Sequence, residues 1–186
     1  MSCLIDQGSA FDCESITQGG IGNYVYLINK TNFDNYQTLT IDTGLTEEIT
    51  ALVLEAGSQG YKFVAPKGNM HVTPSSPFRS ATARDGFDHT MYIVAHDVSQ
   101  VSRENIAKLL YNKVVAIVPL LSGKFLLYGR YVGMRISDYQ ENPGDADLGG
   151  TIQFTLKTPD SDPPEIATPH IIASTFDITS LDSPAA

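Results

Sequence analysis

The residues closest to a catalytic motif in this chain surround Asp42. They read Leu39-Thr40-Ile41-Asp42-Thr43-Gly44, so that apolar residues lead into an Asp-Thr-Gly turn. A carboxylate on such a turn can take part in hydrolysis when a second carboxylate shares its proton, and a chain with one motif could supply that pair only as a dimer. Asp-Thr-Gly is also an ordinary end to a strand, because Asp bonds nearby backbone and Gly tolerates positive φ.

A dimeric aspartic protease that uses Asp42 therefore stays open as one hypothesis for function. Its second element, an apolar pair followed by Gly, could lie at Leu126-Leu127-Tyr128-Gly129. The competing interpretation is a strand that ends at Asp42, where the carboxylate has no chemical role.

Other patterns lack residues that a metal, calcium or nucleotide site requires. The run Asp145-Ala146-Asp147-Leu148-Gly149-Gly150 begins like a calcium loop, but Leu156 stands where a bidentate Glu is required. Ser122-Gly123-Lys124 ends like a phosphate-binding loop, but its first Gly is replaced by Val. The histidines are scattered, and Cys3 and Cys13 of a cytoplasmic chain are more often free than bridged. Apart from the protease hypothesis, the sequence predicts no catalytic residue, no metal and no cofactor.

Length and composition predict a single globular domain with an excess of acidic side chains. The chain has 186 residues, of which 42% are apolar, and this suffices to bury a core without metal or disulfide support. No stretch approaches the roughly 20 apolar residues of a membrane helix, and the N-terminus lacks a secretion signal, so we expect a soluble protein made in a cytoplasm. The net charge is −9, and residues 138–186 supply −8 of it, with nine acidic side chains and the single base Lys157. This balance argues against tight binding of DNA or RNA.

Apolar and polar residues alternate with a period of two along much of the chain, which predicts strands. The alternation is clearest in Thr151–Lys157, and Ser122-Gly123 between two apolar runs predicts a hairpin. Pro119 cannot donate to a neighbouring strand, so we expect it at a bulge or an outer edge. Strands are predicted at 24–28, 37–42, 49–54, 61–64, 70–73, 89–97, 113–121, 124–131, 132–137 and 151–157, and one helix at 102–112 with Ser102 as its N-cap.

Two irregular segments are candidates for function. Pro74–Gly86 is long for a plain connection, and such loops are often functional, although a surface loop without a role is the competing interpretation. From residue 159 onward, Pro, Asp and Ser alternate with short apolar pieces, which predicts a C-terminal arm that becomes ordered on a neighbouring subunit. We therefore divide the chain into a β domain at 1–158 and an extension or arm at 159–186.

A series of short motifs extends over about half of the chain. They are Ser2-Cys3-Leu4-Ile5, Asp12-Cys13, Gly19-Gly20-Ile21 leading into Tyr24-Val25-Tyr26-Leu27, the predicted helix at Ser102–Tyr111, Ser122-Gly123-Lys124-Phe125-Leu126-Leu127-Tyr128-Gly129-Arg130, and Gly149-Gly150-Thr151-Ile152-Gln153-Phe154-Thr155-Leu156 followed by Pro163-Pro164-Glu165. In order and spacing these motifs resemble a virion structural protein family of tailed bacteriophages of the Bacteroidetes-phage type. The middle of the chain, roughly 30–90, takes no part in the resemblance.

The resemblance implies a mainly β, tail-tube-like fold, in which two antiparallel sheets pack as a sandwich or barrel with one flanking helix. It implies a tail tube subunit, not an enzyme, whose hexameric rings stack into the conduit for DNA ejection. The resemblance implies that the protein binds copies of itself and other virion tail proteins, with DNA only as passing cargo and no membrane. It also implies that the protein is located in the virion tail, which is assembled in the bacterial host cytoplasm. The candidate residues are Pro74, Phe78, Arg79 and Arg84 in an inter-ring loop, Asp138, Glu141, Asp145 and Asp147 on an acidic lumen, and His170, Ile171, Ile172 and Phe176 in the C-terminal arm.

Three alternatives remain open at the level of sequence. A head-tail connector, a tail terminator or another ring protein of the virion could share the fold without polymerising. The dimeric aspartic protease would use Asp42, and a small-molecule-binding β-barrel would bind apolar dyes as an isolated monomer.

Overall fold

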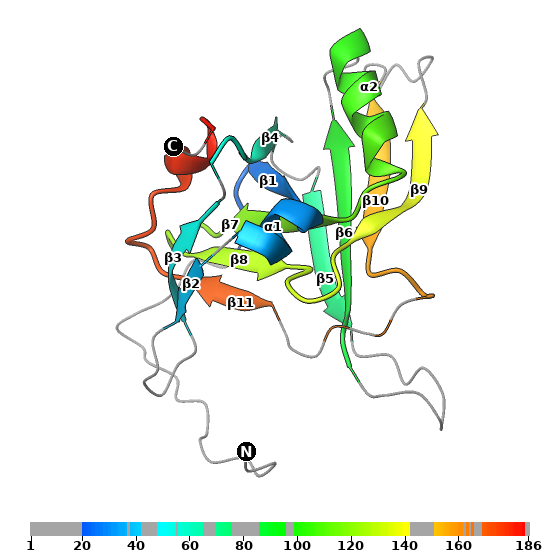
Figure 1. The fold of residues 1–186 in the computed structure, drawn as a ribbon. Helices are drawn as coiled ribbons and strands as arrows, with labels where there is room; N and C mark the ends of the chain where they lie inside the picture. Colours follow the sequence, from blue (N-terminus) through cyan, green and yellow to red (C-terminus); the bar gives the residue numbers. More distant parts are fainter. Residues whose placement is uncertain are drawn as a thin grey trace.

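The residues that a computed structural model of the chain describes form two β-sheets, two α-helices and a 3-10 turn (Figure 1). The structure describes residues 20–36, 38–41, 48–54, 56–64, 70–75, 86–95, 99–141, 151–161, 163, 165 and 169–184, and for 34–36, 38–41 and 70–75 it describes the backbone alone. The strands are β1 (Tyr24–Asn29), β2 (Thr38–Ile41), β3 (Ile49–Val53), β4 (Tyr61–Val64), β5 (Met70–Ser75), β6 (Asp88–Ala95), β7 (Val114–Pro119), β8 (Phe125–Tyr128), β9 (Arg135–Glu141), β10 (Ile152–Lys157) and β11 (His170–Ile172). The helical segments are α1 (Lys30–Tyr36), α2 (Gln100–Leu109) and the 3-10 turn η1 (Ile178–Leu181).

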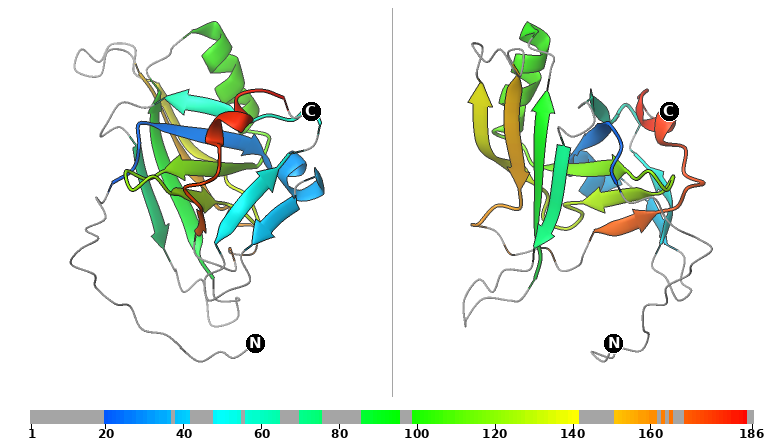
Figure 2. Two further views of the ribbon diagram at one scale, coloured as in Figure 1. Left: turned by 90° about the vertical axis from the view of Figure 1, so that its left-hand side faces the viewer. Right: turned by 180° about the vertical axis from the view of Figure 1, so that it is seen from behind.

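The strands are divided between a larger and a smaller sheet. The larger has seven strands in the order β2-β3-β11-β8-β7-β1-β4, and the smaller has four in the order β5-β6-β10-β9. Neighbouring strands are antiparallel except for β3 and β11, which are parallel. The seven-stranded sheet is strongly curled, and its strands run across those of the other sheet (Figure 2). Two β-sheets with a flanking helix are the fold class that the sequence predicts.

Strand β7 of the larger sheet is buried on both faces. All six of its residues are buried, in an apolar and mostly β-branched run that suits a strand with two covered faces. Val114, Ala116 and Val118 belong to an apolar cluster that also includes residues of the four-stranded sheet. The residues between them, Val115 and Ile117, belong to a second cluster within the curl of the larger sheet. The first cluster joins the two sheets into one folded unit.

Helix α2 and Pro119 differ from their predicted positions. The helix begins at Gln100, because Ser99 and not Ser102 is the N-cap, and the Ser99 hydroxyl accepts a hydrogen bond from the Ser102 N–H at 3.3 Å. Leu110, just after the end of the helix at Leu109, is 45% exposed. Pro119 is the last residue of β7, which lies between β1 and β8, so the predicted outer edge is wrong. Next to Pro119 the register changes, because β7 pairs Ile117 with Tyr26 whereas the following bridge joins Leu120 to Ile21.

Residues 169–184 are part of the domain, which corrects the predicted arm for this segment. Strand β11 lies between β3 and β8 in the larger sheet. Ile172 is fully buried, and Phe176 stacks edge-on against Phe125 with ring centroids 6.2 Å apart. Farther along, Leu181 is buried against Gly60, and the Tyr26 hydroxyl donates a hydrogen bond to Asp182 at 2.5 Å. Each of these contacts is made within a single copy of the chain.

Candidate functional site

The four-stranded sheet has one apolar face and one polar face. Met91, Ile93 and Ala95 of β6 pair with Leu156, Phe154 and Ile152 of β10, and all six are buried in the cluster between the sheets. The residues between them form three rows on the opposite face. These rows are Thr90, Lys157 and Arg135; Tyr92, Thr155 and Asp138; and Val94, Gln153 and Gln140. The Tyr92 hydroxyl donates to the Gln153 side chain at 2.7 Å, so neutral hydrogen-bonding groups dominate this surface.

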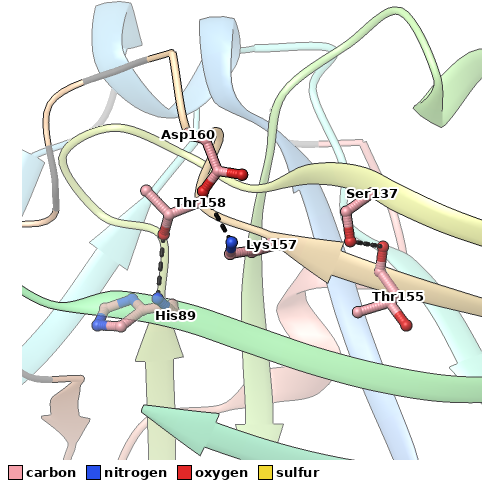
Figure 3. A network of polar contacts seen from close by, with 6 residues as sticks. All are labelled: His89, Ser137, Thr155, Lys157, Thr158 and Asp160. Atoms are coloured by element: carbon pink, nitrogen blue, oxygen red, sulfur yellow. Dashed lines mark hydrogen bonds and ion pairs between the residues drawn. The ribbon is translucent and has the colours of Figure 1, made fainter. Parts of the chain in front are cut away.

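A β-bulge in β9 decides which of its side chains reach the polar face. Thr155 pairs with Asp138, whereas the next residue, Leu156, pairs with Ile136, so that Ser137 is the extra residue. The Ser137 hydroxyl donates to the Thr155 carbonyl at 3.4 Å across this bulge (Figure 3). Without the bulge, Asp138 would face the core, because successive side chains alternate between faces. The bulge therefore places Asp138 on the polar face, beside Thr155.

Glu141 does not share that face with Asp138, although both are predicted on one acidic lumen. It lies three residues further along β9 and pairs with Ile152, whose side chain is buried between the sheets. There its carboxylate forms an ion pair with Arg103 of α2 and accepts a hydrogen bond from the Tyr139 hydroxyl at 3.2 Å. The hydrogen bond from Arg103 lowers the pKa of Glu141, and burial together with Glu141 raises the pKa of Tyr139. Glu141 thus links α2 to the sheet on the face opposite to Asp138.

The other predicted site residues are distributed as follows. Pro74 lies within β5, opposite His89, and not in a loop, because the strand continues to Ser75. Of the C-terminal residues, Ile172 is buried, Ile171 is 41% exposed, and His170 packs near the Tyr131 ring. Phe78, Arg79, Arg84, Asp145, Asp147, Asp42, Cys3 and Cys13 lie outside the residues that the structure describes.

Glu165 has a role that sequence patterns do not reveal. Its side chain is fully buried, and its two carboxylate oxygens accept hydrogen bonds from the backbone N–H groups of Tyr131, Val132 and Gly133 at 2.9, 2.8 and 3.2 Å. Its own backbone forms a two-way bridge with Phe87, just before β6. Glu165 therefore fixes the connection from β8 to β9. A lone Glu after two prolines gives no local signal of such a contact.

His89 forms a second buried polar link between the sheets. Its Nδ1 accepts a hydrogen bond from the Gly129 N–H at 3.0 Å, and its ring stacks edge-on against Tyr128, 5.4 Å away. Its backbone N–H donates to the Thr158 hydroxyl at 3.1 Å (Figure 3). Because Nδ1 accepts this hydrogen bond, it carries no hydrogen itself, and the neutral ring has its hydrogen on Nε2. His89 and Glu165 together hold the end of β8 against β6, so both act in positioning the sheets.

The two edge strands of the smaller sheet are the remaining feature of the site. In the described part of the chain, β5 pairs only with β6 and β9 pairs only with β10. Five of the seven side chains of β9 are exposed. A strand with an unpaired side is a template for pairing with another chain.

Comparison with protein-family models, with curated proteins and with solved structures finds no match for this chain. Among the described residues, no group of three His, Cys, Asp or Glu side chains could hold a metal ion. In the same part of the chain, no helix is long and apolar enough to cross a membrane. The four-stranded sheet, with its polar face and two edge strands, is the feature from which a function can be argued.

Proposed function

We propose that this chain is a non-catalytic structural subunit, and that copies of it join edge to edge into rings that stack as the tube of a bacteriophage tail. The observation that carries the proposal is the four-stranded sheet, whose outer strands β5 and β9 each pair on one side only among the described residues. The motif resemblance to phage virion proteins, from Gly19-Gly20-Ile21 to Pro163-Pro164-Glu165, supplies the biological setting. In this setting the protein belongs to the virion tail, with other tail proteins as further partners.

The directions of the strands favour a closed ring. Every neighbouring pair in the order β5-β6-β10-β9 is antiparallel, so β5 and β9 run in opposite directions. If copies are related by rotation about an axis roughly along the strands, β9 of one copy meets β5 of the next in antiparallel orientation. Such head-to-tail contacts generate a ring when the rotation closes. The ring is then lined by one continuous antiparallel barrel, which removes the exposed edges.

The polar face of the sheet suits the inside of this ring. Its apolar face is already covered by the larger sheet, so the polar face is the one left for the lumen. In the described rows, Asp138 is offset by Arg135 and Lys157, and Lys157 is itself paired with Asp160 at 2.7 Å (Figure 3). The remaining side chains are mostly hydroxyls and amides, which hold phosphate weakly compared with unpaired Lys and Arg. DNA would pass such a surface as cargo without binding tightly.

The experiment that tests the proposal is negative-stain electron microscopy with light scattering across a range of protein concentrations. We expect hollow tubes or stacked rings from the wild-type chain. Single closed rings that never stack would replace the tube with a connector or terminator role. A persistent monomer or dimer would overturn the proposal, and peptide cleavage that Asp42→Asn abolishes would replace it with protease activity.

A pair of variants at one position separates edge pairing from other causes of assembly. Gln140→Pro removes a backbone N–H from the exposed edge strand β9 and should reduce rings by at least about tenfold. Gln140→Thr keeps the N–H and a strand-forming side chain, so it should assemble as the wild type does. Circular dichroism of both variants checks that the isolated subunit stays folded. Normal rings from folded Gln140→Pro would refute β9 as the ring edge.

A further inference from the structure

The connection from β8 to β9, residues 129–134, is held by two side chains that come from distant parts of the chain. The Gly129 N–H donates a hydrogen bond to His89 Nδ1 at 3.0 Å. The N–H groups of residues 131–133 donate to the Glu165 carboxylate at 2.9, 2.8 and 3.2 Å. Both acceptors are buried, His89 with 2% of its surface exposed and Glu165 with none. Four backbone donors of one short connection therefore depend on two ionisable acceptors.

The connection is folded so tightly that its two glycines approach each other closely. A Cβ atom at Gly129 would lie 3.2 Å from the Cα atom of Gly133, and both glycines have a positive φ, of 72° and 83°. At the far end of the connection, Met134 exchanges two backbone hydrogen bonds of 2.8 Å with Val114 of β7. Backbone groups do not titrate, so these two bonds are insensitive to pH. Any release of the connection by acid is therefore limited to the residues between β8 and Met134.

Proton uptake by His89 and its hydrogen bond to Gly129 exclude each other. A neutral imidazole offers one nitrogen as an acceptor, whereas an imidazolium carries a hydrogen on both nitrogens and offers none. A hydrogen on Nδ1 would point at the Gly129 N–H across the present 3.0 Å, so the two groups would have to separate. Histidine is the side chain that ordinarily changes its charge between pH 5 and 8. A modest fall in pH can therefore break this bond.

Glu165 responds to acid in the same direction as His89. Its Oε2 accepts a hydrogen bond from Tyr131, and its Oε1 accepts from Val132 and Gly133. A proton on either oxygen turns an acceptor into a donor and sets it against a backbone N–H. Side-chain carboxyl groups ordinarily take up their proton about two pH units below imidazole. As the pH falls, we therefore expect the bond to His89 to break first and the bonds to Glu165 second.

The other charged and titratable groups around His89 keep their charge between pH 5 and 8. Burial raises the pKa of Tyr128, whose ring stacks against His89, to about 12, so its hydroxyl stays neutral. Lys30 of α1 donates from Nζ to the Arg130 carbonyl at 2.6 Å, and the Arg130 guanidinium lies over the Tyr131 ring. These two cations oppose a further positive charge on His89. The charged residues beside His89 on its own sheet alternate onto the opposite face: Asp88 of β6, Lys157 of β10 and Arg135 of β9.

We propose that His89 and Glu165 form a proton-sensitive latch on the connection from β8 to β9, which is closed at neutral pH and opens in two steps as the pH falls. Proton uptake by His89 releases the Gly129 N–H, and protonation of Glu165 then releases residues 131–133. Strand β9 begins at Arg135, directly after the connection, so the latch holds the start of an edge strand of the four-stranded sheet. The latch belongs to the single subunit and does not depend on the assembly proposed above.

Amide hydrogen exchange of the full-length subunit, measured by NMR at pH 7 and pH 5, tests the first step. Each rate is divided by that of an unstructured chain, because exchange itself slows in acid, and the ratio gives the protection of the amide. We expect protection of the Gly129 N–H to fall at least about tenfold at pH 5. The Met134 N–H is the internal control, because it donates to the backbone carbonyl of Val114, and its protection should change less than about twofold. Unchanged protection at Gly129 would overturn the latch, and so would equal losses at both amides, because they would mean that acid unfolds the whole domain.

A variant of His89 that accepts a hydrogen bond but does not titrate tests the cause of this loss. His89→Asn places an amide oxygen near the position of Nδ1, so protection of the Gly129 N–H should agree within about twofold at pH 7 and pH 5. His170→Asn in β11 is the matched control and should keep the tenfold loss of the wild type. If His89→Asn does not fold, nitrogen-15 shifts of the wild-type imidazole decide the question. A midpoint for His89 protonation more than about one pH unit from the midpoint of the Gly129 loss would overturn the latch.

The second step is tested at the Val132 N–H, which donates to Glu165. In the wild type we expect this amide to stay protected at pH 5 and to lose protection about tenfold at pH 4. Glu165→Gln should lower protection at pH 7 and remove the further loss at pH 4, because an amide does not titrate. Loss of protection at Val132 together with Gly129 at pH 5 would overturn the two-step order. A loss at pH 4 that persists in Glu165→Gln would overturn the role of Glu165.

Discussion

The two sheets of this protein use their faces differently. The interior of the seven-stranded sheet, at β1, β7 and β8, is covered on both sides, and β7 contributes alternate residues to two separate apolar clusters. The four-stranded sheet covers one face and leaves hydroxyls, amides and a few charges on the other. Burial of apolar surface is the main favourable term in folding. We therefore expect the larger sheet to supply more of the stability of the subunit, and the smaller sheet to present the surfaces that would bind further copies in the proposed ring.

The largest expected difference between the sheets is in the cost of truncating one side chain. Ile117→Ala in β7 removes a fully buried side chain and should lower the free energy of unfolding by about 2–5 kcal/mol. Thr155→Ala, on the polar face of β10, should cost less than about 1 kcal/mol. Urea unfolding of the dissociated subunit measures both. Similar losses from the two variants would break the proposed division between a stabilising and an assembling sheet.

The next largest effect on stability is expected at Glu165, whose buried carboxylate holds the connection from β8 to β9. Glu165→Gln removes the charge that three backbone N–H groups share and turns an amide N–H₂ toward one of them. We expect a loss of about 2 kcal/mol in the free energy of unfolding. Glu104→Gln on the exposed side of α2 makes the same chemical change and should stay within about 0.5 kcal/mol of the wild type. Equal free energies of unfolding for the two variants would show that the Glu165 carboxylate adds nothing to stability.

Tyrosine titration gives a smaller contrast. Burial raises the pKa of Tyr128, at the end of β8, to about 12. A raised folded-state pKa means that its contribution to stability is complete below the unfolded value near 10 and is lost as the pH rises through 12. The pKa values of Tyr26 and Tyr139 are also raised, so ultraviolet absorbance at 295 nm should show several late ionisations, and Tyr128→Phe should reduce their amplitude by that of one tyrosine. Tyr111, which is 81% exposed, is the control, and Tyr111→Phe should leave the late transition in place.

The smallest expected effect is the pH dependence of the contact between α2 and β9. Arg103 lowers the pKa of Glu141, so the stability this pair contributes is present at neutral pH and is lost as the pH falls through the lowered value. Carboxyl-carbon NMR should give a lower pKa for Glu141 in the wild type than in Arg103→Gln. Lys157→Gln is the control, because it removes the partner of Asp160 and not of Glu141. An unchanged Glu141 pKa in Arg103→Gln would mean that the ion pair does not persist in solution.

Much of the fold could be predicted from the sequence because strand patterns are local. Period-two alternation locates β6 and β10, and the apolar run before Ser122-Gly123 locates the hairpin of β7 and β8. The turn follows from Gly123, whose φ of 83° is costly for other residues. Helix α1 was missed, since seven residues make only about two turns and are too few to show a helical period. Strand β11 was missed because three residues in a Pro-rich segment are too few to show alternation.

In the candidate site too, features with local causes could be predicted from the sequence, and features that depend on distant contacts could not. The sequence determined the composition of the chain, the concentration of acid after residue 138 and most of the strands, because each depends on residues close together in the chain. The tertiary structure decided which face each acid occupies: one extra residue at Ser137 sends Asp138 to the polar face, and Arg103 holds Glu141 on the other. It also decided that the Glu165 carboxylate accepts hydrogen bonds from the distant backbone of residues 131–133. These outcomes depend on partners far apart in the chain, and no local pattern encodes the choice of such a partner.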